Sequence, residues 1–354
     1  MHGTKRDAER RLRALLAEVE TGGYADGGRT SCADLFTGWL AATEHRVGAK
    51  TVQRYGSIVR LYLVPAFGGL RAEQLRPAHI EAAVAKWATG PRNDKEKGTL
   101  SPRSVKHALD TLRAALRWAV RMGILVRDPA DAVSSIKVER KEMRTLDAAG
   151  VAALVEAARG SELENLIIVA VGSGLRRGEL CGLRWRDVDF EASRISVRRS
   201  VEVVDGERRE KEPKTARSAR TIAVPGFVVE ALRAQRKAQN ERRLLLGLGR
   251  DDNAYVFDRA DGTAYDPGPL SLHFARLVKS AKLEHVRLHD LRHSAATLML
   301  ASGADLKSVS TWLGHSEVGT TGNLYLHHVE QIERAATARF NDLLGASLTT
   351  SRKK

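Results

Sequence analysis

Apolar residues in the first third of the chain recur at steps of three and four, which is the period of amphipathic helices. The first such stretch covers residues 5–20, and a glycine-rich segment follows it. Four more stretches of the same period cover residues 32–43, 51–65, 77–88 and 102–123. This part of the chain is therefore expected to form one separate helix and then a small all-helical domain.

Residues that favour helix starts stand at or near the beginnings of these stretches. Ser31, Thr51 and Ser101 carry short polar side chains that can cap a helix N-terminus. Pro77 and Pro102 suit the first turn of a helix, where the N–H that proline lacks has no partner in any case. The expected helix boundaries thus have a local physical cause.

A second apolar-rich region begins after the charged segment 137–144, which is a candidate linker. Asp147 can cap a helix that runs to Ala158. Residues 162–174 form a further helical pattern that is apolar on almost every face, as a buried helix is. The residues at the end of this helix are therefore expected to lie against a core.

The apolar period changes from that of a helix to that of a strand further along. Apolar and polar residues alternate at 194–204, the Asp-Gly dipeptide at 205–206 is a typical hairpin turn, and 221–224 supplies another strand. Helical patterns resume at Phe227, interrupted by a short strand expected at 255–257. The fold is therefore expected to be mainly α with a small antiparallel β-sheet, a helical domain preceding a mixed α+β domain.

Charge restricts the class of partner. The 354 residues include 58 Lys and Arg against 43 Asp and Glu, for a formal net charge of +15 and a pI near 10.1. Such a chain favours a polyanion, with nucleic acid ahead of an anionic membrane because no apolar run approaches the roughly 20 residues of a spanning helix. The low aromatic content of 5% favours duplex over single-stranded nucleic acid. We expect a soluble, cytoplasmic, nucleoid-associated protein.

Neither the cysteines nor the charged loop adds a further site. Cys32 and Cys181 are too few for a disulfide framework and lack the spacing of a zinc site, so both are interpreted as reduced, structural thiols. The charged segment 91–98 is either a solvated loop or a loop that contacts DNA.

Four short segments of the second region combine residue types that carry chemistry. They are GSGLRRGELCGLRW at 172–185, PKTARSARTI at 213–222, LHDLRHSAATLML at 288–300 and LGHSEVGTTGNLY at 313–325. Each alone has a plainer explanation, such as a helix start with exposed arginines, a solvated lysine or a core tyrosine. In this order and together, they resemble the tyrosine recombinase family of phage integrase type.

The resemblance is strong from about residue 145 to 330 and weaker through the helical domain, which looks like that family's core-binding, SAM-like domain. It implies the domains 1–30 (a helix and linker, remnant of an arm-binding region whose strands are missing), 31–136 (core-binding), 137–144 (linker), 145–340 (catalytic) and 341–354 (basic tail). The missing strands imply either a truncated gene or a protein that manages without arm DNA.

The resemblance assigns two arginines and a carboxylate to the site. Arg176 matches the first catalytic arginine, Arg292 matches the arginine of the H-x-x-R pair, and Glu179 helps to hold the first motif in place. Independently of family, a phosphodiester under attack gains negative charge on its nonbridging oxygens, and two guanidiniums can bind these by paired hydrogen bonds. Arg176 and Arg292 are the predicted phosphate clamp.

The remaining matches supply the nucleophile and the proton transfers. Tyr325 matches the nucleophile, which needs nearby positive charge and a proton acceptor because the pKa of a phenol is about 10. His289 and His315 match the two histidines and can supply a base and hydrogen bonds, in either order. Lys214 matches the hairpin lysine, which by resemblance protonates the departing 5′ oxygen.

No cofactor is expected, since a 3′-phosphotyrosine conserves the energy of the broken bond until a second strand's 5′-hydroxyl displaces the tyrosine. No metal is expected either, because the arginines already neutralise the phosphate. His289 and His293 stand four residues apart, but the glutamate of H-E-x-x-H is absent, so His293 is interpreted as a ring packed beside Arg292.

The resemblance thus implies an integrase that recombines double-stranded DNA attachment sites, through a Holliday junction, to integrate or excise a mobile element. It implies a homotetramer on two DNA sites, with an accessory directionality factor or DNA-bending protein as a further partner. Two alternatives stay open: a catalytically silent DNA-binding regulator of the same fold, and an enzyme like type IB topoisomerase.

A final apolar stripe follows Tyr325. Its members recur at helical steps, and they are Val329, Ile332, Ala336, Phe340 and Leu343. Such a helix is expected to pack either on its own catalytic domain or, as the resemblance suggests, on a neighbouring protomer.

Overall fold

The computed structural model describes residues 30–94, 96–139, 145–212 and 219–314, together with Arg6 and Arg10. By contacts between residues the chain divides into two compact units, Met1–Lys141 and Glu142–Lys354, which we call the helical unit and the second unit. The helix expected at 5–20 lies almost wholly outside the described residues, as does the stripe after Tyr325.

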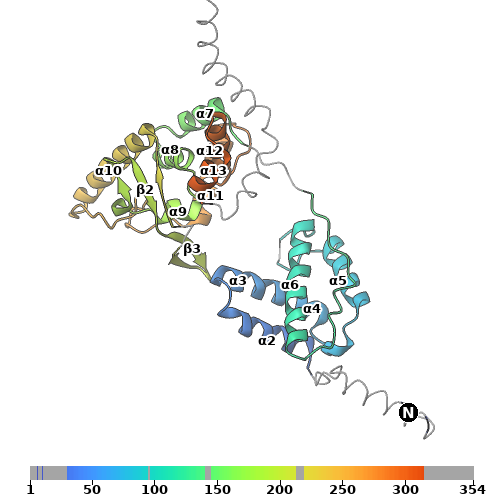
Figure 1. The fold of residues 1–354 in the computed structure, drawn as a ribbon. Helices are drawn as coiled ribbons and strands as arrows, with labels where there is room; N and C mark the ends of the chain where they lie inside the picture. Colours follow the sequence, from blue (N-terminus) through green and yellow to red (C-terminus); the bar gives the residue numbers. More distant parts are fainter. Residues whose placement is uncertain are drawn as a thin grey trace, which may run out of the picture. The chain divides into compact units, whose positions relative to one another are not determined.

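The described part of the helical unit is built only from helices, drawn in blue to blue-green in Figure 1. They are α2 (Cys32–Glu44), α3 (Ala49–Ile58), the π-helix η1 (Val59–Leu63), α4 (Val64–Phe67), the 3-10 helix η2 (Ala72–Gln74), α5 (Pro77–Thr89) and α6 (Pro102–Arg121). The helix predicted at 51–65 is therefore one uninterrupted helical segment, in which α3 is followed directly by η1 and α4. Its backbone hydrogen bonds change from the α to the π pattern at Val59.

Local capping explains where α2 and α6 begin. The Ser31 hydroxyl accepts a hydrogen bond from the backbone of Asp34 at 3.1 Å, and that of Ser101 accepts one from Ser104 at 3.2 Å, as predicted. The prediction for Thr51 was wrong, because α3 begins at Ala49 after an extended Gly48 and Thr51 lies inside its first turn. The side chain of a residue inside the turn cannot cap the helix start.

The core of the helical unit forms around α6. Leu109, Leu112 and Leu116 are fully buried on this helix, at the spacing that aligns them on one face. Trp87 of α5 lies edge-on to Tyr62 and Phe67, with ring centroids 6.2 and 6.0 Å away. The apolar residues that recur at helical spacing in the sequence thus pack together in the core of this unit.

The second unit combines helices with two small sheets. Its helices are α7 (Ala148–Ala158), α8 (Glu164–Ser173), α9 (Arg177–Gly182), the 3-10 helix η3 (Trp185–Asp187), α10 (Gly226–Leu245), α11 (Pro267–Ser280), α12 (Asp290–Ala301) and α13 (Leu306–Leu313). The α8 helix contacts α7, α10 and α12 and lies in the middle of the unit, as its apolar faces predicted (Figure 1).

The strands are β1 (Val188–Asp189), β2 (Arg194–Val197), β3 (Ser200–Val204), β4 (Glu207–Lys211) and β5 (Arg220–Ala223). The mainly α fold with antiparallel strands is confirmed, but the single sheet is not. In the part of the chain that the structure describes, one sheet has the order β1-β2-β5 and a second sheet pairs β3 with β4. The alternation breaks at Arg198 and Arg199, so the two halves of the predicted stretch pair with different partners.

The strand predicted at 255–257 was also wrong. Among the described residues this segment makes one isolated bridge, between Tyr255 and Arg184, with backbone hydrogen bonds from Val256 to Leu183 and from Trp185 to Ala254. A single bridge between two chain segments does not extend into a ladder of paired strands, although Val256 and Phe257 are buried as the apolar pattern required.

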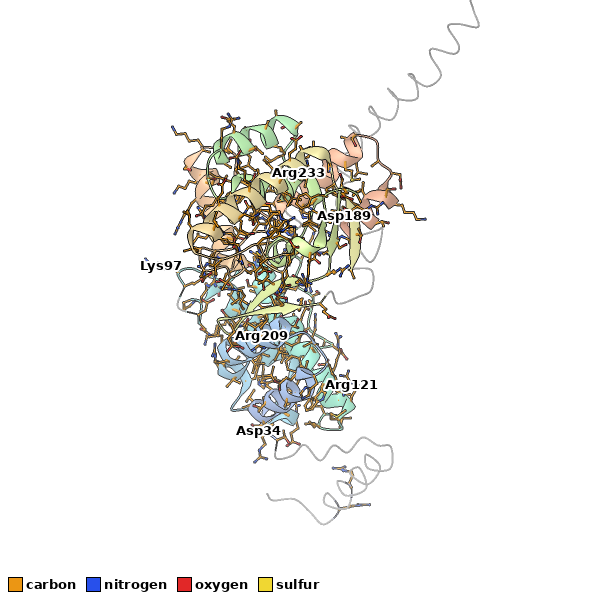
Figure 2. The ribbon with its side chains drawn as sticks, turned by 90° about the vertical axis from the view of Figure 1, so that its left-hand side faces the viewer. Asp34, Lys97, Arg121, Asp189, Arg209 and Arg233 are labelled. Carbon is orange, nitrogen blue, oxygen red and sulfur yellow. The ribbon has the colours of Figure 1, made fainter. Side chains whose placement is uncertain are left out.

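The remaining expectations from the sequence concern membrane-spanning helices, the two cysteines and the charged surface. No described helix is both long and apolar enough to cross a membrane. Cys32 and Cys181 are both free and buried, and burial raises the pKa of the Cys32 thiol to about 11. Charged side chains from both units lie at the surface, among them the six labelled in Figure 2: Asp34, Lys97, Arg121, Asp189, Arg209 and Arg233.

Candidate active site

The turn between α8 and α9 positions Arg176. Gly174 ends α8 in the left-handed conformation, with φ of 59°, and a Cβ there would lie 2.6 Å from the Trp312 ring. Arg176 then stands at the N-cap of α9, where its backbone N–H donates to Glu179 Oε2 at 2.9 Å and its Nη1 donates to Oε1 at 2.8 Å. Glu179 therefore binds both the backbone and the guanidinium of Arg176.

Arg292 approaches the same turn from α12. Its side chain is buried, with Nη1 donating to the Gly174 carbonyl and Nη2 to the Leu313 carbonyl, each at 2.6 Å. Arg176 Nη2 donates to the next carbonyl, that of Gly314, at 3.0 Å. The two predicted clamp arginines, far apart in sequence, thus meet at the end of α13.

Arg176 and Arg292 differ in their access to a ligand. The side chain of Arg176 is 37% exposed, whereas the whole Arg292 residue is 2% exposed. A guanidinium carries five N–H groups, and Glu179 and Gly314 take one donor each from Nη1 and Nη2 of Arg176. Arg176 therefore has donors that an incoming phosphate oxygen can reach.

A third arginine at this place was missed by sequence reasoning. Arg220, the first residue of β5, donates from Nη1 and Nη2 to the two oxygens of Glu179 at 3.2 and 3.0 Å, and from Nε to the Trp312 carbonyl at 2.9 Å. Its side chain is only 7% exposed. The available signal was its position two residues before Ile222, which places a cation on the buried face of a strand.

Glu179 is consequently a buried carboxylate between two arginines. Burial by itself would raise its pKa, but the hydrogen bonds and charges of Arg220 and Arg176 outweigh burial, and the pKa lies below the ordinary value. Glu179 is therefore ionised at neutral pH. Its charge compensates the guanidiniums that would otherwise repel one another at the site.

His289 stands immediately before α12, three residues from Arg292. Desolvation, followed by the positive charge of Arg292, lowers the pKa of His289 below that of an ordinary histidine. His289 is an exposed residue, and its ring meets the His293 ring edge-on, with centroids 5.3 Å apart. His289 is thus a neutral imidazole at neutral pH, able to accept a proton or a hydrogen bond.

His293 is the more buried of the two rings, as its interpretation as a packing residue requires. Desolvation, and then the neighbouring His289, lowers its pKa to about 4. Within the described residues, no cluster of three His, Cys, Asp or Glu side chains has the arrangement of a metal site.

The other predicted site residues are Lys214, His315 and Tyr325, and all three lie outside the described residues. The structure therefore brings together Arg176, Arg292 and Glu179, with His289 on the adjacent helix start. His315 directly follows Gly314, the residue whose carbonyl Arg176 binds.

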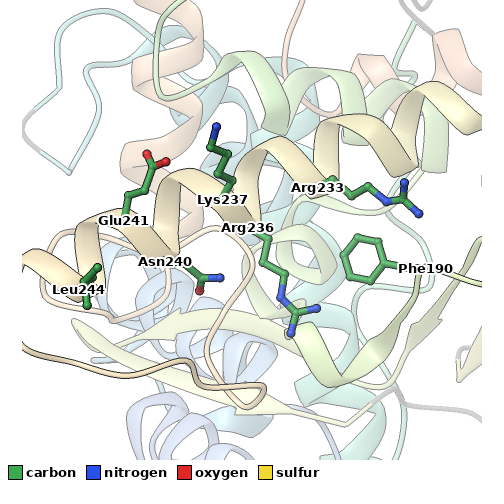
Figure 3. Close-up of a pocket in the computed structure, with 7 residues that line it drawn as sticks. All are labelled: Phe190, Arg233, Arg236, Lys237, Asn240, Glu241 and Leu244. Carbon is green, nitrogen blue, oxygen red and sulfur yellow. The ribbon is translucent and has the colours of Figure 1, made fainter.

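A separate open hollow of about 520 Å³ runs along α10 (Figure 3). It is lined by Phe190, Arg233, Arg236, Lys237, Asn240, Glu241 and Leu244. Arg236 stacks over the rings of Phe190 and Trp185, 5.4 and 5.3 Å from their centroids, and pairs with Asp252. None of the predicted site residues that the structure describes lines the hollow, so its basic residues are separate from the arginine site.

Comparison with known proteins identifies the family. The sequence profile of the Phage integrase family matches residues 144–331, and that of the phage integrase N-terminal SAM-like domain matches residues 33–88. The chain belongs to the phage integrase family. It is accordingly a tyrosine recombinase, an enzyme of DNA recombination, as the four motifs predicted.

Relatives by sequence include recombinases and integrases. A tyrosine recombinase XerC of Xanthomonas campestris pv. campestris is 30% identical, covering 84% of this chain and 85% of the relative. A protein named tyrosine recombinase XerC-like from Caldanaerobacter subterraneus subsp. tengcongensis is 28% identical over 96% of this chain and 90% of the relative. The ICEBs1 integrase of Bacillus subtilis is 29% identical over 69% and 67%.

Solved structures share the fold. The Tn1549 transposon integrase in complex with a circular intermediate DNA gives a TM-score of 0.70 at 21% identity, covering 88% of this chain and 99% of that one. The lambda integrase tetramer bound to a Holliday junction gives 0.59 at 18% identity, covering 90% and 89%. At these identities, the likeness establishes a common architecture.

Proposed function

We propose that this protein cleaves and rejoins DNA at specific attachment sites through a 3′-phosphotyrosine at Tyr325, and so integrates or excises a mobile element. The observation that carries the proposal is the meeting of Arg176 and Arg292 at the end of α13, directly before His315. Two guanidiniums at one place are what a phosphodiester needs as its nonbridging oxygens gain charge.

The proposed reaction begins with attack of the Tyr325 oxygen on the scissile phosphorus. Arg176 and Arg292 stabilise the five-coordinate state, and His289, neutral because its pKa is lowered, is suited to accept a proton or hydrogen bond alongside His315. Lys214 donates a proton to the 5′ oxygen as its bond to phosphorus breaks. The 5′-hydroxyl of a second strand then attacks the phosphotyrosine, re-forms the phosphodiester and releases Tyr325.

We assign the DNA-binding role to both parts of the chain. Residues 31–136 act as the core-binding domain, 137–144 as the linker and 145–340 as the catalytic domain, with 1–30 and 341–354 flanking them. Both domains are proposed to contact duplex DNA, to which the net charge of +15 attracts them. Affinity for a cognate duplex should therefore fall steeply as the salt concentration rises. An affinity that did not change with salt would contradict binding through the DNA phosphates.

We further propose a homotetramer on two DNA sites, since the lambda integrase neighbour is described as a tetramer on a Holliday junction. The helix expected after Tyr325 would dock on the neighbouring protomer and so couple assembly to cleavage. An accessory directionality or DNA-bending protein would select between integration and excision.

The decisive experiment traps the covalent intermediate. The probe is a nicked duplex carrying the site that the full chain selects from random-sequence DNA, so that the cleaved end is lost and the protein stays attached. We expect Tyr325→Phe to bind this duplex normally and to form no adduct, because only the nucleophilic oxygen is lost. Tyr265→Phe is the matched control, since its hydroxyl contacts Glu162 and it should keep the adduct.

The outcomes separate the proposal from its two alternatives. A covalent adduct with Phe at 325 would reject the nucleophile, and a wild-type chain that bound the site without any adduct would identify a silent regulator. Relaxation of supercoiled DNA that lacks the selected site would instead indicate activity like that of a type IB topoisomerase.

A further inference from the structure

We propose that Arg220 is a positioning residue for DNA cleavage, which holds the end of α13 and Glu179 in the geometry that the phosphate clamp requires. The inference rests on the proposed function, because it assigns a role within the same site. It concerns a residue that makes no part of the predicted catalytic set and that the structure places at its centre.

Three consecutive carbonyls at the end of α13 each accept a hydrogen bond from a different arginine. The Trp312 carbonyl accepts from Arg220 at 2.9 Å. The Leu313 and Gly314 carbonyls accept from Arg292 at 2.6 Å and from Arg176 at 3.0 Å. The position of this helix end therefore fixes where both clamp arginines lie, and Arg220 is the third donor that fixes the helix end.

The physical basis is the charge at a helix C-terminus. The last carbonyls of a helix have no partner within the helix and carry partial negative charge. Charged donors form the stronger class of hydrogen bond to such groups. The α13 helix is short and ends at Gly314, which has the left-handed conformation. The arginines therefore donate hydrogen bonds to carbonyls that have no partner within the helix.

Arg220 also joins this helix end to Glu179. One planar guanidinium places Nε on the Trp312 carbonyl and Nη1 and Nη2 on the two Glu179 oxygens. Glu179 in turn binds Arg176 Nη1 at 2.8 Å, and Arg176 binds the Gly314 carbonyl. The hydrogen bonds form a closed ring from β5 through α9 to α13. Loss of Arg220 would therefore shift Arg176 by two routes, through Glu179 and through the end of α13.

Close packing leaves Arg220 little freedom of its own. A Cβ on Gly314 would lie 2.9 Å from Arg220 Cδ, so the arginine stem passes directly against the backbone of that residue. With a side chain only 7% exposed, Arg220 is placed to act on the scissile phosphate through Arg176 and the α13 end rather than by contact. A lysine has a single ammonium and cannot span both the carboxylate and the carbonyl in this planar arrangement.

The test compares single-turnover cleavage with binding and folding, in the full chain and on the nicked duplex described above. Arg220→Ala should lower the cleavage rate constant at saturating protein by about 10- to 100-fold, the scale expected when reacting groups shift by about 1 Å. Affinity for the duplex should stay within about twofold, because Arg220 is not the group that touches DNA. Arg220→Lys should restore only part of the rate.

Arg199→Ala is the matched control. Arg199 is a similarly buried arginine of the same unit, 12% exposed, and its ion-pair partners are Asp187 at 2.6 Å and Glu210 at 3.7 Å, neither of which lies on α13. Its loss should lower the unfolding temperature as Arg220→Ala does while the cleavage rate constant of the folded protein is retained. Equal cleavage losses in both variants at equal destabilisation would mean that Arg220 only stabilises the fold, and the proposal would be overturned.

Further outcomes decide the remaining cases. Wild-type cleavage by Arg220→Ala would overturn the positioning role and leave the Tyr325 chemistry intact. If Arg220→Ala fails to fold, Arg220→Lys decides: slowed cleavage with retained affinity supports the role, and full cleavage rejects it. Absence of any Tyr325-dependent adduct in the wild-type chain would instead reject the proposed function itself.

Discussion

The helical unit buries almost only apolar side chains, whereas the second unit also buries several polar and charged ones. Among the described residues the helical unit has a single buried polar residue, Thr111, whose hydroxyl bonds back to the His107 carbonyl at 2.7 Å. The buried polar residues of the second unit are Ser173, Glu179, Asp187, Gln239, Asp258, Asp290, Arg292, His293, Ser294, Thr297 and Ser310.

The difference shows two ways of holding a structure together. Apolar packing in the helical unit is non-directional, so its stability depends on filled volume and tolerates many exchanges of similar shape. The second unit has its own apolar core, and it adds directed bonds between charged groups, each of which is costly to bury without its partner. The phosphate-binding role proposed for Arg176 and Arg292 would require such directed bonds to hold both guanidiniums in place.

The largest effect is expected from removing the carboxylate between the arginines. Glu179→Ala leaves the buried Arg220 without its counter-charge, which typically costs about 3 to 5 kcal/mol of unfolding free energy. Regional hydrogen exchange, read by mass spectrometry in the full chain, should show faster exchange in α9, β5 and α13 and unchanged exchange in α6. Equal loss of protection in α6 would remove the distinction between the two units.

Acid should also act on the second unit through its buried histidine. The pKa of His293 is about 4 in the folded protein against 6.5 ordinarily, because of burial and then of His289, with Asp290 opposing and Arg292 assisting. The unfolded chain therefore binds more protons between these values, and stability falls as pH falls. Between pH 6.5 and 4.5 we expect a loss of about 2 to 3 kcal/mol.

The measurement is the unfolding free energy across that range for the wild type and for His293→Gln. The variant should show a flatter dependence, since its side chain does not titrate. Glu179 and Asp290 have lowered pKa values, so their contribution is lost mainly below this range and does not obscure the comparison. Parallel curves for the two proteins would show that His293 takes no part.

The smallest effect is expected at a helix cap of the helical unit. Ser101→Ala removes the hydroxyl that accepts from the Ser104 backbone at the start of α6, which should cost about 1 kcal/mol. Faster exchange should be confined to the first turn of α6 and its neighbours, and the rate of DNA cleavage should be unchanged. Ser101→Asp serves as the control, because aspartate caps equally well and should retain stability.

The sequence by itself determined the secondary structure wherever the cause is local. The three-and-four period set α2, α5 and α6, Ser31 and Ser101 set where two of them begin, and the Asp205-Gly206 dipeptide set the β3–β4 hairpin. The order of the motifs also led us to expect Arg176, Glu179 and Arg292 in one site, and these three side chains lie close together. These features depend on neighbours within a few residues or on chemistry that needs particular groups.

Only the tertiary structure decided which strands pair and what holds the arginines. The stretch 194–204 reads as one alternating pattern, yet its halves belong to different sheets because β5 pairs with β2 and not with β3. The role of Arg220 depends on carbonyls of α13 that lie far along the chain, and a backbone carbonyl is the same in every residue. No pattern of side chains in the sequence can therefore predict these hydrogen bonds. Only the folding of β5, α9, α12 and α13 against one another brings the arginine donors to the carbonyl acceptors of α13.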